Sequence, residues 1–89
     1  MTAARVVRLG LSFPSLRGRP GIQPWAPELL AHWAAGPSPS LGAHHAARFL
    51  LALWGYPQTS PFDVHDAMTV WDAEHRRAFL DWAIAPWWC

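Results

Sequence analysis

The fold is decided by residues 62–88, FDVHDAMTVWDAEHRRAFLDWAIAPWW, which contain signals for two helices in close succession. Ser60 can cap the first helix, with Pro61 as its first residue and Asp63 near the positive end of the helix dipole. Asp72 can cap a second helix, which ends before the proline of APWW because proline cannot continue a helix. Since almost no loop separates them, the stretch predicts a compact helical pair.

Helical periodicity assigns an inward face to each of these two helices. The residues expected inward on the first helix are Val64, Ala67, Met68 and Trp71. Those expected inward on the second helix are Phe79, Leu80, Ala83 and Ile84. Glu74, Arg77 and Asp81 fall on the opposite side, where their spacing allows weak surface ion pairs.

Two further helices are expected upstream of this pair. One runs over about 24–35 or 26–35, because proline is tolerated in a first turn. The next begins near Ser38 or Ser40, either of which can cap it, and stops at Gly55. Its apolar face is formed by Ala46, Phe49, Leu50, Leu53 and Trp54. Because its other side is also partly apolar, we expect this helix to be the central one.

The N-terminal segment is ambiguous between strand and helix. Residues 7–13 alternate apolar and other side chains, which is typical of a half-buried strand. The apolar positions are Val7, Leu9, Leu11 and Phe13. A short helix over residues 2–9 is the alternative, favoured by two alanines and disfavoured by two adjacent valines. We expect residues 1–23 to form an extended arm or loop that packs on a helical domain of residues 24–89.

The sequence therefore predicts a mainly α fold, a small bundle of about four short helices with an extended N-terminal arm that can include one short strand. A chain of 89 residues is one domain, and its core is small. The residues expected to be most buried are Trp33, Phe49, Leu50, Leu53, Trp71, Phe79 and Leu80.

The aromatic content predicts a contact surface. Hydrophobic residues make up 52% of the chain and charged residues 15%, which excludes intrinsic disorder. Seven tryptophans, each able to bury about 150–250 Å², exceed what so small a core can hide. Trp87 and Trp88 follow a helix-ending proline, so one ring can fold back while the other faces outward. The alternative is that both rings cover the core.

These features predict a small non-enzymatic protein–protein interaction domain, of a bacterial or phage type, that binds a protein partner or itself as a homodimer. The partner-binding residues expected are Trp87, Trp88, Val7, Leu9, Leu11 and Phe13. An accessory protein that binds nucleic acid is the alternative, because four arginines precede any acidic residue and could follow a phosphate backbone. They are Arg5, Arg8, Arg17 and Arg19. Asp63 and Asp66 would repel phosphates at the start of a recognition helix, so this alternative is the less favoured one.

Catalytic and metal-binding patterns are not evident in the sequence. It contains no phosphate-binding glycine loop, its serines occur in turn or cap contexts, and no base is suggested beside them. His65 and Asp66 are of metal-ligand type, but a zinc site would need two ligand pairs at set spacings. We therefore expect no catalytic residue, no metal, no cofactor and no small-molecule substrate.

The cellular compartment follows from the cysteine content and the hydropathy. A single cysteine excludes an internal disulfide and favours a reducing compartment. The sequence shows no export signal and no apolar run long enough to span a membrane. We expect a cytoplasmic protein without a membrane span.

Overall fold

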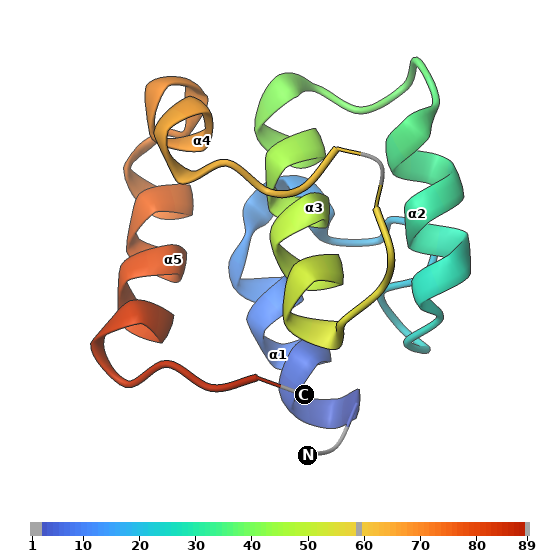
Figure 1. The fold of residues 1–89 in the computed structure, drawn as a ribbon, viewed down its shortest axis with the longest axis horizontal. Coiled ribbons are helices and arrows are strands. Elements are labelled where there is room, and N and C mark those ends of the chain that lie inside the picture. Colours follow the sequence, from blue (N-terminus) through green and yellow to red (C-terminus); the bar gives the residue numbers. More distant parts are fainter. Residues whose placement is uncertain (1–2, 59, 89) are drawn as a thin grey trace.

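The computed structural model describes residues 3–58 and 60–88, which form five α-helices and one 3-10 turn, η1 (Figure 1). The elements are α1 (Ala3–Ser12), η1 (Pro14–Leu16), α2 (Pro27–Ala35), α3 (Leu41–Trp54), α4 (Val64–Val70) and α5 (Ala73–Ile84). The prediction of a mainly α protein is confirmed, and the described residues contain no strand. Thr2, where the alternative N-terminal helix was expected to begin, and Cys89 lie outside the described residues.

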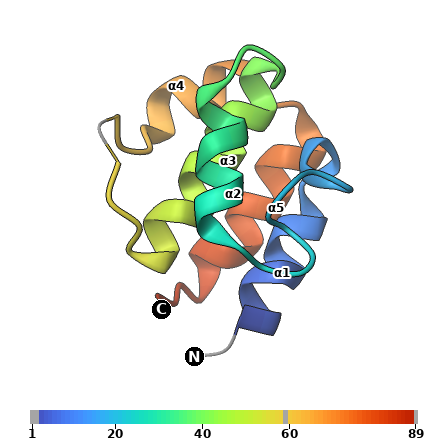
Figure 2. The same cartoon turned by 90° about the vertical axis from the view of Figure 1, so that its right-hand side faces the viewer.

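Helix α3 is the centre of the bundle, as expected. It contacts α1, η1, α2 and α4, and Figure 2 shows α2 lying across it. Its buried side chains point in nearly every direction around the helix axis, because neighbours surround it. They are Ala43, His45, Ala46, Ala47, Phe49, Leu50, Leu51 and Leu53.

Three of the expected helix boundaries are confirmed. Ser40 caps α3, where its side chain accepts a hydrogen bond from the backbone N–H of Ala43 at 3.2 Å. Gly55 closes the same helix in the left-handed conformation, at φ 81°. Asp72 caps α5 and accepts from the backbone N–H of His75 at 2.9 Å.

The expected start of α4 was wrong. The helix begins at Val64, and Asp63 is its N-cap, accepting from the backbone N–H of Asp66 at 3.1 Å. The preceding backbone stays extended, since Phe62 packs its ring 5.1 Å from that of Phe49 in the core. Val64 is exposed rather than inward, whereas Ala67 is fully buried as expected.

The predicted extended arm with a strand was also wrong. Residues 3–12 are helical, and Val6, Gly10 and Phe13 are buried at positions spaced three and four residues apart. Gly10 allows a close helix contact, because a Cβ there would lie 3.0 Å from Leu50 Cδ1. The helix satisfies its own backbone hydrogen bonds, which a lone strand could not do.

The inward face of α5 differs from the predicted one. The inward residues are His75, Ala78, Phe79 and Trp82. Leu80 and Ile84, expected in the core, are 51% and 82% exposed. The aromatic side of the helix turns inward because Phe79 and Trp82 both pack against Phe49, with ring centroids 5.2 and 5.0 Å apart. Aromatic side chains bury more apolar area than leucine or isoleucine.

His45 on α3 is a buried titratable group. The residue is 9% exposed, and its Nδ1 has no hydrogen-bond partner among the described residues. Burial lowers the pKa of His45, and the nearby positive charges of His44 and Arg48 lower it further. Asp66 and Asp63 act weakly in the opposite direction. The folded protein therefore disfavours the charged form of this imidazole.

We expect the protein to lose stability as the pH falls through the ordinary titration range of histidine. As the pH falls, His45 binds a proton in the unfolded chain at its ordinary pKa, whereas in the folded protein it does so only at a lower pH. The stability gained from keeping His45 neutral is therefore complete above the unfolded pKa and is lost as the pH falls below it. Between about pH 7.5 and 5.5, the melting temperature of His45→Gln should fall less than that of the wild type. His32→Gln, at an exposed position on α2, is the control and should keep the full drop. Equal drops in all three proteins would contradict this prediction.

Candidate functional site

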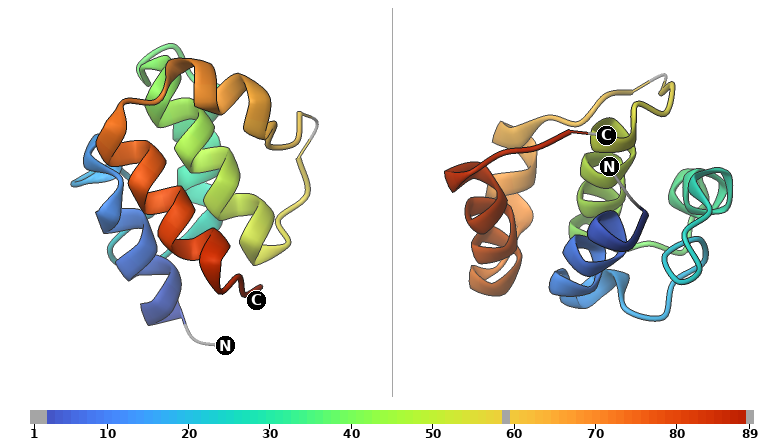
Figure 3. Two further views of the ribbon diagram at one scale, coloured as in Figure 1. Left: turned by 90° about the vertical axis from the view of Figure 1, so that its left-hand side faces the viewer. Right: turned by 90° about the horizontal axis from the view of Figure 1, so that it is seen from below.

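The outward side of α5 is an apolar stripe. Leu80 and Ile84 lie one helical turn apart and are largely exposed, and Ala73 lies on the same side of the helix. Figure 3 (left) shows α5 at the front of the molecule, where no other helix of the described residues covers it. The opposite side of α5 is in the core, so this helix is apolar on two sides.

Charged side chains border the stripe. Ala73, Arg76, Arg77, Leu80 and Asp81 line a shallow hollow in the surface. The guanidinium of Arg76 is held in place, since its Nη2 donates to the carbonyl of Met68 at 2.7 Å. We call the set Ala73, Arg77, Leu80, Asp81 and Ile84 the α5 face. It combines a hollow near one end with a projecting side chain, Ile84, near the other.

The sequence pattern did not predict the α5 face, because it favoured a buried position for Leu80 and Ile84. One feature of the sequence could have indicated this face: the apolar residues of α5 occupy more of the helix circumference than a single buried side can hold. His75, Ala78, Phe79 and Trp82 point inward, whereas Leu80 and Ile84 point outward. A helix that is apolar on two sides indicates a second contact surface.

The two tryptophans after α5 take different positions. Trp87 is half-buried, with the guanidinium of Arg5 4.5 Å above its ring, and its carbonyl accepts from Trp82 Nε1 at 2.9 Å. Trp88 is 62% exposed, and the centroid of its ring lies 5.5 Å from that of Trp82 in an edge-to-face arrangement. One ring folds back and the other faces outward, as expected. The role of either residue in partner binding stays a prediction.

The N-terminal residues expected to bind a partner belong largely to the domain itself. Phe13 is fully buried, so its assignment to a contact surface was wrong. Leu9 and Leu11 are partly buried against the core, and Val7 is also half-buried. These side chains face different directions around α1 and its end, so they do not form one strip.

The four N-terminal arginines are spread over two elements. Arg5 and Arg8 lie on α1, whereas Arg17 and Arg19 follow η1. Three of them contact their own chain. Arg5 covers Trp87, Arg17 Nε donates to the carbonyl of Leu11 at 2.8 Å, and Arg19 Nε donates to the carbonyl of Ser15 at 3.3 Å. Nucleic-acid binding stays a prediction without added support from this arrangement.

Metal-ligand types gather at the start of α4. Asp63, His65 and Asp66 offer ligand atoms within 4.8 Å of one another, and all three residues are exposed. Their contacts serve the helix, since Asp63 caps it and His65 Nδ1 lies 3.5 Å from the Asp66 carboxylate. The cluster therefore has a structural explanation.

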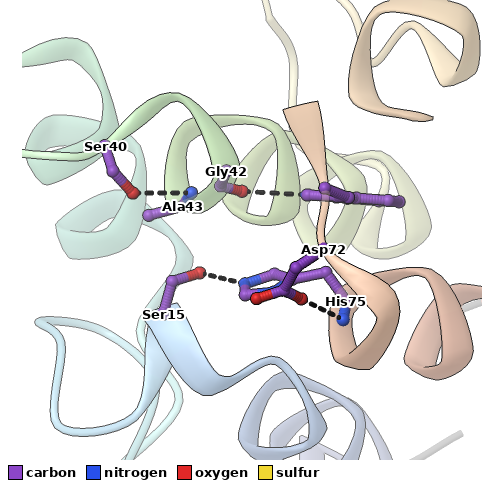
Figure 4. A network of polar contacts seen from close by, with 7 residues as sticks. Ser15, Ser40, Gly42, Ala43, Asp72 and His75 are labelled. Carbon is purple, nitrogen blue, oxygen red and sulfur yellow. Dashed lines mark hydrogen bonds and ion pairs between the residues drawn. The ribbon is translucent and has the colours of Figure 1, made fainter. Parts of the chain in front are cut away.

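A second polar cluster joins η1 to α5 (Figure 4). The Ser15 hydroxyl lies 2.6 Å from His75 Nε2, and His75 Nδ1 lies 2.8 Å from the Asp72 carboxylate. The backbone N–H of His75 and then its ring hold the pKa of Asp72 below its ordinary value. The sequence suggested no base beside any serine, but the fold supplies one from 60 positions away.

The structure thus defines a small all-α domain arranged around α3. No helix in residues 3–58 and 60–88 is long and apolar enough to cross a membrane. The chain matches no known family model, no curated protein and no solved structure. Its function must be argued from its own surfaces and side chains.

Proposed function

We propose that this protein is a small interaction domain that pairs with a second copy of itself through the α5 face. The observation that carries the proposal is the pair of exposed apolar side chains, Leu80 and Ile84, on a side of α5 that no other helix in residues 3–58 and 60–88 covers. Burying a fully exposed leucine or isoleucine contributes about 1.5–3 kcal/mol, and a dimer buries both side chains from each copy. The gain for Leu80 is smaller, because it is 51% exposed in the monomer.

The α5 face is complementary to itself. When two copies of α5 pack antiparallel about a two-fold axis, Ile84 of each copy comes opposite the small side chain of Ala73 in the other. The projecting residue of one copy then meets the hollow of its partner. A two-fold contact uses the same patch on both copies, so a surface with a hollow and a projection at opposite ends suits it.

The charges support the same arrangement. In the antiparallel pair, Arg77 of each copy lies within reach of Asp81 of the other, which gives two opposite-charge contacts at the rim. A parallel pair would instead bring like charges together. Rim pairs contribute little to affinity but select the orientation of the partners.

We expect Ile84→Asp to weaken dimerisation at least about tenfold, because it places a carboxylate in the apolar contact. Ile84 is 82% exposed, so the monomer should keep its helix content and melting temperature. Sedimentation equilibrium gives the dissociation constant. Leu29→Asp, at a residue of α2 that is 55% exposed, is the matched control and should dimerise like the wild type.

The charge contacts allow a second test of the geometry. Arg77→Asp should weaken the dimer, and adding Asp81→Arg in the same chain should restore it. A wild-type protein that stays monomeric at millimolar concentration would contradict the proposal. So would equal losses in the α5 and α2 variants, since another surface would then hold the dimer.

A further inference from the structure

We propose that Ser15 is a nucleophilic serine, activated by His75, that accepts an acyl group from carboxylic esters and related acyl donors. The geometry that carries this inference is the chain of two short contacts in Figure 4. Ser15 Oγ lies 2.6 Å from His75 Nε2, and Asp72 Oδ1 lies 2.8 Å from His75 Nδ1. Nucleophile, base and orienting acid occur in this order in serine acyl transfer.

The contact with Asp72 fixes which nitrogen of His75 carries the proton. A carboxylate accepts hydrogen bonds, so Nδ1 carries a proton, and in the neutral imidazole Nε2 then has a free lone pair. Ser15 must then donate its hydroxyl proton to Nε2. Asp72 also accepts from the backbone N–H of His75 at 2.9 Å, which keeps its carboxylate ionised and in place.

The aromatic core holds the imidazole in this orientation. His75 is 6% exposed, and its ring lies 5.8 Å from Phe13 and 6.4 Å from the stacked ring of Trp71. Trp71 is anchored in turn, since its Nε1 donates to the carbonyl of Gly42 at 3.0 Å. The base is therefore shielded and preorganised, whereas Ser15 on η1 is only partly buried and can meet a reagent.

The reaction step balances with the groups at hand. Ser15 Oγ attacks the acyl carbon while its proton moves to His75 Nε2, and the imidazolium then gives that proton to the departing alkoxide. The products are an acyl ester on Ser15 and a free alcohol. Water attacks the acyl ester in the same manner, releases the carboxylic acid and restores the serine.

Covalent labelling of the full chain tests the inference. The probe is an alkyl fluorophosphonate, which forms an Oγ–P bond as the P–F bond breaks, with fluoride leaving and the serine proton passing to His75. Intact mass and peptide mapping should show one adduct, on Ser15, and none in Ser15→Ala. Ser12→Ala is the matched control and should label like the wild type, since the Ser12 hydroxyl only donates to the carbonyl of Arg8 at 3.0 Å.

The orienting acid is tested by Asp72→Asn, which keeps an N-cap acceptor and removes the charge. Labelling should slow at least about tenfold while circular dichroism shows unchanged helix content. The inference is overturned by an absence of adduct on Ser15, or by an Asp72→Asn labelling rate equal to that of the wild type.

Discussion

Phe13→Ala is expected to lower the free energy of unfolding by about 3–5 kcal/mol. Phe13 is fully buried, and its ring lies 6.0 Å from Phe49 and 5.3 Å from Trp71. Removing the ring leaves a cavity beside Phe49, Trp71 and His75, and these side chains cannot all collapse into it. Since a domain of this size has only about 5–15 kcal/mol of stability, urea or thermal unfolding should show a large loss.

Leu80→Ala is the matched control for this substitution. Leu80 is 51% exposed on the outward side of α5, so its truncation should cost less than about 1 kcal/mol in the monomer. The sequence pattern predicted Leu80 in the core and Phe13 on a contact surface. The two variants therefore distinguish the burial seen in the structure from the burial that the periodicity predicts. A loss at Leu80 as large as that at Phe13 would restore the predicted face of α5.

Local signals in the sequence predicted much of the fold. Ser40, Gly55 and Asp72 act through the backbone groups of their immediate neighbours, so their roles can be recognised without knowledge of the tertiary structure. The central place of α3 followed from apolar residues on more than one side of that helix. These features depend on short stretches of chain, for which local physics is sufficient.

The errors arose where two periodicities fit the same residues. In α1, an alternating strand pattern at residues 7–13 competes with a helical pattern of Val6, Gly10 and Phe13. Gly10 looks like a helix stop, but it serves as a contact point with Leu50. Only the tertiary contact decides between these interpretations, since intrinsic propensity is a weak guide. In α5 the helix was predicted correctly, but its rotation was not, because both sides are apolar.

The two candidate sites illustrate the same limit. The contact of Ser15 with His75 joins residues 60 positions apart, and no motif spacing signals it. The α5 face depends on knowing which apolar side of the helix the aromatic core takes. Both sites therefore depend on the aromatic packing around Phe49. This packing sets the rotation of α5, which exposes the α5 face and places His75 beside Ser15.

Gly21→Ala is expected to lower the free energy of unfolding by about 2–5 kcal/mol, the sum of a backbone penalty and an overlap. Gly21 has φ +84°, a conformation that residues with a Cβ rarely adopt. An added Cβ would also lie 2.5 Å from both the carbonyl oxygen of Ala26 and the backbone nitrogen of Leu30. These are backbone atoms at the start of α2, so they cannot move aside as a flexible side chain could.

Gly18→Ala separates the two causes. Gly18 has a similar φ of +73°, but a Cβ there meets nothing within 4 Å among the described residues. It should therefore incur only the backbone penalty, about 1–2 kcal/mol. Relaxation at Gly21 is restricted because Ala26 N donates to the Gly21 carbonyl at 2.8 Å, which ties the turn to the start of α2. The difference between the two variants in urea unfolding measures how rigidly this turn holds α2, and equal losses would contradict the close packing of Gly21.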